Sequence, residues 1–214
     1  MLEFVEGPLW YTALAIFLAG TCWRIAGALL SGRKQVPDPA RGSPAIGVLQ
    51  SMVAYMLPRG PFFDRPKVLF VFLAGYAFHL GLFILLLFGA PHVTFIKEHL
   101  LGVGWTPLPR WGFIVAAEVA VLGLLMLWVR RMIDPVTRMI SRIDDHIAAG
   151  LTMMVMLTGC FALGEQSDAM RTLHMLSVDV WLIYFPFGSL IHTFTWIFTR
   201  GFTGALFAKR GIRA

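Results

Sequence analysis

The chain is 214 residues long, 57% hydrophobic and 14% charged, with a mean hydropathy of +0.72. Such a composition excludes an ordinary soluble domain and is typical of polytopic membrane proteins. The net charge of +6 does not indicate a nucleic-acid partner, because the basic residues are scattered around apolar segments and form no single patch or reading helix.

The first apolar segment, residues 8–30, is long enough to cross a bilayer. It has neither a basic region before it nor a small-residue cleavage site, so we expect a retained span and not a signal peptide. Its one charged residue, Arg24, lies near enough to the end of the span to extend to the interface or to meet an anionic group there. A proline-rich connection follows, and then a short apolar stretch, residues 45–57, that we predict to be an amphipathic helix on the membrane surface.

Four further segments have the length and hydropathy of membrane spans, namely residues 68–89, 111–129, 147–163 and 172–199. Five spans with short connections predict an all-α fold, an integral membrane five-helix bundle that forms a single domain over residues 1–214. Cys22 and Cys160 both fall inside apolar segments and outside any metal-binding cluster. Neither an iron–sulfur motif nor a structural disulfide is therefore expected.

The orientation follows from the Lys and Arg residues in the connections, which concentrate on the cytoplasmic side of membrane proteins. One side holds Arg33, Lys34, Arg41, Arg59, Arg65, Lys67, Arg130, Arg131, Arg138, Arg142, Arg200, Lys209, Arg210 and Arg213. The other side holds only Lys97, Arg110 and Arg171. We therefore expect the N-terminus outside and the C-terminus in the cytoplasm, in the cytoplasmic membrane of a bacterial or archaeal cell.

Histidines occur near both ends of the last segment, at His174 and His192. In one uninterrupted helix, at about 1.5 Å and about 100° per residue, they would lie on one face about 27 Å apart. That distance is close to the bilayer's hydrocarbon thickness of about 30 Å. The spacing predicts one axial ligand for each of two haems, and the alternative is a pair of interfacial or packed core histidines.

The partners of these histidines are predicted by the direction of the spans. The second segment runs from the cytoplasm outward and the fifth runs inward, so His92 shares the outer level with His174, and His79 shares the inner level with His192. His79 and His92 are about 20 Å and about 220° apart on an ideal helix, which is not one stripe. Pro91 breaks or kinks a helix, and it either re-aims the imidazole of His92 or leaves His92 in a loop.

Three features together resemble the gamma subunit of respiratory nitrate reductase: the fifth-segment sequence LHMLSVDVWLIYFPFGSLIHTF, the FHLG motif at His79, and the five-span outline. The chain is also similar to the membrane cytochrome b subunits of sulfite-reduction-associated and heterodisulfide-reductase-like complexes. In the gamma subunits the second-span histidines are ten residues apart, which corresponds to Gly89 here, whereas this chain carries His92. The resemblance implies a dihaem b cytochrome that transfers electrons between quinone, near the outer haem, and cytoplasmic iron–sulfur or other redox subunits.

The resemblance also directs attention to polar residues at the outer depth. Lys97 and His99 are candidates for contact with a quinone head group, and the alternative for His99 is a solvated loop residue. Glu118 and Asp179 are candidates for proton transfer, because acids inside a bilayer are costly and often functional, although either can simply pair with a polar neighbour.

Two polar residues lie near the cytoplasmic ends of spans. Arg24 is a candidate for contact with an inner haem propionate, against the alternative that its side chain only reaches the interface. His146 follows two aspartates at the start of the fourth span, where we expect a structural hydrogen bond or cap.

Two other functions remain open on the sequence. A monohaem cytochrome would use only His79 and His192, and a haem-free membrane anchor, proton relay or transporter would use none of the histidines as ligands. In every case complete enzymatic activity by the chain alone is not expected, because no segment can hold a flavin, a molybdenum centre or an iron–sulfur cluster.

Overall fold

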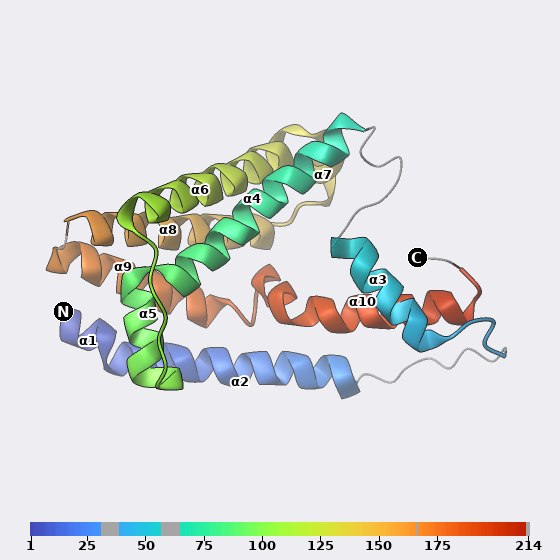
Figure 1. Ribbon diagram of the computed structural model, residues 1–214, viewed down its shortest axis with the longest axis horizontal. Helices are drawn as coiled ribbons and strands as arrows, with labels where there is room; N and C mark the ends of the chain where they lie inside the picture. The colour runs from blue at the N-terminus through green and yellow to red at the C-terminus, as the bar shows by residue number, and fades with distance from the viewer. Residues whose placement is uncertain (31–38, 57–64, 166, 213–214) are drawn as a thin grey trace. The chain divides into compact units, whose positions relative to one another are not determined.

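The computed structural model describes residues 1–30, 39–56, 65–165 and 167–212, and their regular structure is entirely helical (Figure 1). The topology count given above includes Arg33, Lys34, Arg59 and Arg213, which lie outside these residues. The helices are α1 (Leu2–Glu6), α2 (Pro8–Leu30), α3 (Pro44–Met56), α4 (Pro66–Phe88), α5 (Ala90–Ile96), the π-helix η1 (Lys97–Leu101), α6 (Arg110–Ile133), α7 (Pro135–Ile140), α8 (Ile143–Glu165), α9 (Asp168–Tyr184), the 3-10 helix η2 (Ser189–Ile191) and α10 (His192–Lys209).

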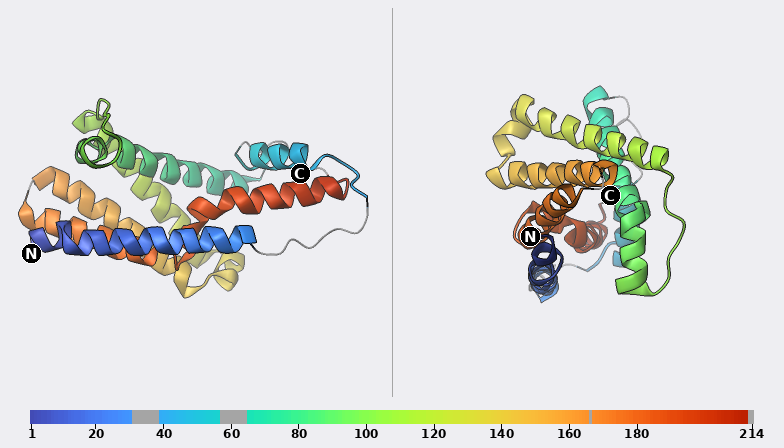
Figure 2. Two further views of the ribbon diagram at one scale, coloured as in Figure 1. Left: turned by 90° about the horizontal axis from the view of Figure 1, so that it is seen from below. Right: turned by 90° about the vertical axis from the view of Figure 1, so that its left-hand side faces the viewer.

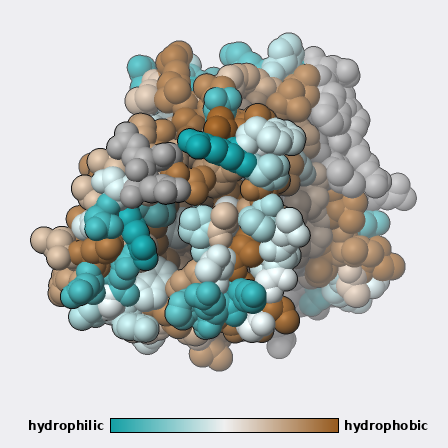
Figure 3. Space-filling view, turned by 60° about the vertical axis from the view of Figure 1, so that its left-hand side comes forward, coloured by the Kyte–Doolittle hydropathy of each residue, from teal (hydrophilic) through white to brown (hydrophobic). Residues whose placement is uncertain are grey.

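The described residues contain four helical segments long and apolar enough to span a bilayer: Leu2–Leu30, Pro66–Phe88, Arg110–Ile133 and Ile143–Leu163. A fifth span is present if the broken pair α9 and α10 is counted as one. Large apolar side chains reach the surface, for example Leu73 and Leu80 of α4, and Figure 3 shows such apolar surface beside clusters of hydrophilic groups. The chain is therefore a multi-pass membrane protein, as the composition predicts.

The last predicted span is interrupted in its middle. Pro186 cannot continue a helix, and the amides of Phe187 and Gly188 both donate to the carbonyl of Tyr184, at 3.0 and 3.1 Å, which closes α9. A Cβ atom on Gly188 would lie only 2.4 Å from the Tyr184 ring, so the turn also requires glycine. The expectation of one continuous helix is wrong, and the distance that it gave between His174 and His192 does not apply.

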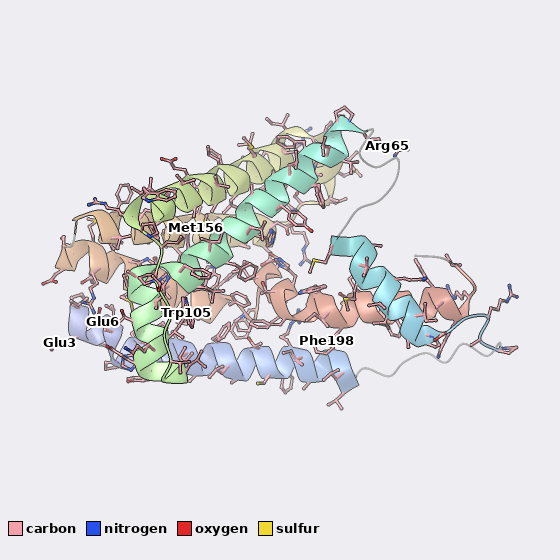
Figure 4. All side chains as sticks on the ribbon, in the orientation of Figure 1. Glu3, Glu6, Arg65, Trp105, Met156 and Phe198 are labelled. Carbon is pink, nitrogen blue, oxygen red and sulfur yellow. The ribbon has the colours of Figure 1, made fainter. Side chains whose placement is uncertain are left out.

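The chain divides into two compact units, Met1–Trp10 with Lys67–Trp181, and Tyr11–Pro66 with Leu182–Ala214, and each is described by itself. In the first unit α6 and α8 run side by side, and Met156 of α8 belongs to the buried core between them (Figures 2 and 4). Glycines bring α4 close to α6, because a Cβ on Gly81 would meet Ala120 at 2.7 Å and one on Gly123 would meet the Phe78 amide at 2.6 Å. Small residues at helix crossings are typical of packing in membranes.

Polar contacts connect the remaining parts of the first unit. The indole of Trp181 donates to Thr152 at 3.0 Å and joins α9 to α8. Arg171 of α9 forms a salt bridge with Glu6 of α1, which is labelled in Figure 4. The indole of Trp105, also labelled, donates at 2.8 Å to the carbonyl of Leu87 and fixes the long α5–α6 connection against the end of α4.

In the second unit α3 packs along α10, as Figure 2 shows. The two backbones touch at glycines: a Cβ on Gly47 would lie 2.3 Å from the Gly204 carbonyl oxygen, and one on Gly204 would lie 2.3 Å from that of Gly47. The Arg41 amide donates to the Lys209 carbonyl at 3.0 Å near the end of this contact. The stretch expected as a surface helix is thus helical, but it buries one face against another helix of the protein.

Candidate functional site

Two of the predicted ligands, His92 and His174, lie close together within the first unit. Gly89 has an extended backbone and ends α4, and Pro91 then stands in the first turn of α5, so His92 belongs to a new helix and not to a loop. His174 comes from the second turn of α9. The two imidazole centroids are 6.4 Å apart, the ring planes differ by 34°, and both side chains are half-buried.

This separation suits two axial ligands of one metal ion. The bond between a metal and an imidazole nitrogen is about 2.0 Å long, and that nitrogen lies about 1.1 Å from the centre of its ring. Two imidazoles on opposite sides of one metal ion therefore have centroids about 6 Å apart. The observed 6.4 Å agrees with that value. The described residues contain no group of three or more His, Cys, Asp or Glu side chains that could hold a metal ion. A pair of histidines instead suits a haem, whose porphyrin supplies the other four ligands.

Hydrogen bonds orient both rings through Nδ1. The Nδ1 of His92 lies 3.0 Å from the Leu85 carbonyl, which can only accept, so this nitrogen carries the proton. Nδ1 of His174 lies 3.2 Å from the Thr158 hydroxyl, which itself donates to the Met154 carbonyl at 2.8 Å and can therefore accept from the ring. These tautomers leave Nε2 of each ring as the nitrogen with a lone pair for a metal. Outer hydrogen bonds of this kind fix the orientation of metal-binding histidines.

A buried hydroxyl pair supports His174 from behind. Thr158 of α8 and Ser177 of α9 are 2.9 Å apart, and Ser177 donates to the carbonyl of His174 at 2.7 Å. Sequence reasoning missed both hydroxyls. A usable signal existed, because Ser177 follows His174 by three residues and so lies on the same helix face.

Glycines lie directly against both imidazoles. A Cβ on Gly159 would come within 3.0 Å of Cε1 of His174, and one on Gly89 within 3.2 Å of Nδ1 of His92. The His92 ring thus lies beside residue 89, the position to which the resemblance assigns the outer ligand.

The inner pair, His79 and His192, belongs to different units, and each residue is described alone. Nδ1 of His79 lies 2.8 Å from the Gly75 carbonyl, and Nδ1 of His192 lies 2.6 Å from the Ser189 carbonyl. Both side chains are exposed. Both rings therefore have the Nδ1-protonated form found at His92, and their pairing at one level stays a prediction.

The residues predicted to contact quinone or to transfer protons differ in how exposed their side chains are. Lys97 and His99 lie in η1 and are exposed, and the His99 ring lies 5.0 Å from that of Phe95. Glu118 is exposed on α6. Asp179 has no exposed surface, and neither of its carboxylate oxygens has a hydrogen-bond partner among the described residues. Of these four side chains, Asp179 alone is fully buried.

Two candidates lie outside this site. Nδ1 of His146 accepts a hydrogen bond from the Trp128 indole at 3.1 Å, which confirms the expected structural hydrogen bond. Arg24 lies in the second unit, where it lines a cavity beside the break after α9.

Comparison with known proteins leaves the family open. No protein-family model matches the chain. A protein of Nitratidesulfovibrio vulgaris (strain Hildenborough) is 26% identical over an alignment of 219 positions, which covers 99% of this chain and 96% of the relative. Its name is simply "Protein" and states no activity. The chain is thus similar to a bacterial protein over almost the whole length of both.

Proposed function

We propose that this chain is a dihaem b-type cytochrome subunit of a respiratory oxidoreductase complex in the bacterial or archaeal cytoplasmic membrane. Its fold would be a five-span bundle with the N-terminus outside and the C-terminus in the cytoplasm. The observation that carries the proposal is the proximity of His92 and His174, whose ring centroids are 6.4 Å apart. The resemblance to the gamma subunit of nitrate reductase, based on independent sequence features, supports it.

His92 and His174 would hold the outer haem through their Nε2 atoms, and a bound haem supplies one-electron exchange. The carbonyl of Leu85 and the hydroxyl of Thr158 keep the two rings in the required tautomer and orientation. At the inner site, His79 and His192 would take the same role, each with its Nδ1 on a carbonyl of its own segment.

Oxidation of hydroquinone releases protons, and the outer polar residues are suited to receive them. Lys97 and His99 follow α5, the helix that carries His92, and are exposed to contact a quinone head group. Asp179 is five residues from His174 and is buried without a hydrogen-bond partner among the described residues. A buried carboxylate without a hydrogen-bond partner is costly inside a bilayer, and such groups are often functional, so we assign Asp179 a role as proton acceptor. We assign Glu118 the same kind of role nearer the surface.

The electrons would pass to, or come from, cytoplasmic subunits with iron–sulfur or other redox centres. This assignment is supported by the same resemblance, which also extends to sulfite-reduction-associated and heterodisulfide-reductase-like complexes. The membrane bilayer and quinone complete the set of proposed partners.

A haem count on the purified full chain tests the proposal. We expect a Soret band and two haems per chain in a pyridine haemochrome assay. His146→Ala serves as the matched control, since this histidine has a structural hydrogen bond, and it should leave the count at two. One haem per chain would favour the monohaem cytochrome. The absence of any Soret band from the membrane-purified protein would favour a haem-free anchor, proton relay or transporter.

A further inference from the structure

The apolar helix α2 contains one arginine, Arg24. Arg24 is six residues, or about 9 Å along an α-helix, from the end of α2 at Leu30. Its side chain is exposed, and no ion pair or hydrogen bond joins it to another residue within 1–30, 39–56, 65–165 or 167–212. An arginine guanidinium stays protonated, and in a membrane span it requires an anionic or polar partner.

Arg24 lines a defined cavity within the second unit. The cavity has a volume of about 360 Å³ and is lined by Gly20, Trp23, Arg24, Pro186 and Phe187. It exists because α2 meets the break after α9 at very short range: a Cβ on Gly20 would lie 2.6 Å from the Pro186 ring. Trp23 and Phe187 form aromatic walls and are 79% and 72% exposed.

The residues that line this cavity favour an amphiphilic ligand that carries an anionic group. Guanidinium binds phosphate or carboxylate oxygens through two parallel hydrogen bonds, while the aromatic rings suit the apolar part of the same molecule. Thr21 lies three residues before Arg24, on the same side of the helix, and its hydroxyl is buried with no hydrogen-bond partner among the described residues. Thr21 and Arg24 are thus two neighbouring polar side chains of α2 for which the described residues provide no partner.

We propose that this cavity binds the phosphate group of a membrane phospholipid. The phosphate would accept hydrogen bonds from Arg24, and the glycerol and upper acyl chain would lie against Trp23 and Phe187. Phospholipid phosphates occupy the depth to which an arginine this close to a helix end extends its side chain. A haem propionate offers the same anionic chemistry to Arg24. The phospholipid is favoured because exposed walls admit a molecule from the surrounding bilayer.

Native mass spectrometry of the full chain, purified in mild detergent and titrated with phosphatidylglycerol, tests the proposal. We expect one tightly retained lipid in the wild type and about tenfold weaker retention in Arg24→Gln, because charge-assisted hydrogen bonds are lost. Arg24→Lys should recover part of the binding, and Phe187→Ala should weaken it while the charge is unchanged. Arg138→Gln is the matched control: it removes the same charge from an exposed position on α7 and should bind lipid as the wild type does.

Three results would overturn the proposal. Equal lipid retention in the wild type and Arg24→Gln would show that Arg24 does not bind the phosphate. Equal weakening in Arg24→Gln and Arg138→Gln would indicate a general effect of surface charge. Loss of haem absorbance in Arg24→Gln with unchanged lipid retention would assign Arg24 to a haem propionate. Because lipid retention is measured without reference to haem, the proposal stands or fails separately from the proposed function.

Discussion

The two histidine pairs are positioned in different ways. His92 and His174 are oriented by contacts between helices, since Thr158 of α8 holds His174 of α9 and the His92 ring lies 6.4 Å from that of His174. His79 and His192 each place Nδ1 on a carbonyl three or four residues earlier in their own segment, and the His79 ring also lies 4.6 Å from that of Phe78. The fold of the first unit therefore brings the outer pair together, whereas the inner histidines belong to different units and are described singly.

The largest expected effect is the loss of the inner haem signal when His79 or His192 is substituted. If His79 and His192 ligate one iron, then His79→Ala and His192→Ala should each abolish the same haem signal, because a haem that has lost one axial ligand no longer keeps its low-spin spectrum. Redox-resolved optical spectra of the two variants measure this. Loss of different haems in the two variants would refute their assignment to one level.

A large kinetic effect is expected at Asp179, beside the outer pair in sequence. Asp179→Asn removes the titratable proton with little change in volume, and quinol-driven haem reduction should become about 100-fold slower, as is usual when a general base is lost. Haem content should stay unchanged. Asp168→Asn, at the exposed start of the same helix, is the control, and equal rates in the two variants would remove Asp179 from the proton pathway.

A smaller effect is expected in Gly159→Ala, where only the retention of the outer haem should change. In Gly159→Ala the new Cβ would lie 3.0 Å from the His174 ring and push it a few tenths of an ångström. Disturbing the support of a metal ligand typically weakens metal binding by about tenfold. The outer haem should therefore be lost more readily on dilution in detergent, while the inner haem is retained. Gly27→Ala, with no atom within 4 Å of its new Cβ, should leave both haems in place.

The smallest effect is expected at Asp134, which is in neither histidine pair. Its carboxylate accepts the amides of Thr137 and Val136 at 3.1 Å and caps α7, and the Thr137 hydrogen bond is the main reason that the pKa of Asp134 is below its ordinary value. A lowered pKa means that the cap stabilises the fold above the ordinary carboxyl pKa, and that this contribution is lost as the pH falls toward the lower folded value.

Asp134→Ala should accordingly lower the Tm slightly at pH 7 and by less at pH 3, with both haems retained. Thermal melts at the two pH values check this. A Tm difference that grows as the pH falls would contradict the assigned role of the cap.

Several features were predictable from the sequence because they depend on local composition. Hydropathy alone predicts the membrane class and the helical fold. A structural hydrogen bond at His146 was expected from its position at the start of the fourth span, although its donor, Trp128, was not. The proximity of His92 and His174 was predictable from span direction, even though the helix that carries His92 starts anew after Gly89.

Other features depend on contacts between helices, and the sequence does not encode these locally. Continuous hydropathy concealed the break at Pro186, although the FPFG sequence contained the signal. The packing of α3 on α10 depends on Gly47 meeting Gly204, residues far apart in the chain. Thr158 was missed for the same reason, since its role arises only where α8 meets α9.

The central claim is that His92 and His174 ligate one haem iron, and redox titration of the optical spectrum in His92→Ala and His174→Ala tests it most directly. We expect each substitution to remove the same haem component and to leave the other component at its wild-type potential. Removal of two different components, or a wild-type spectrum in either variant, would contradict the account.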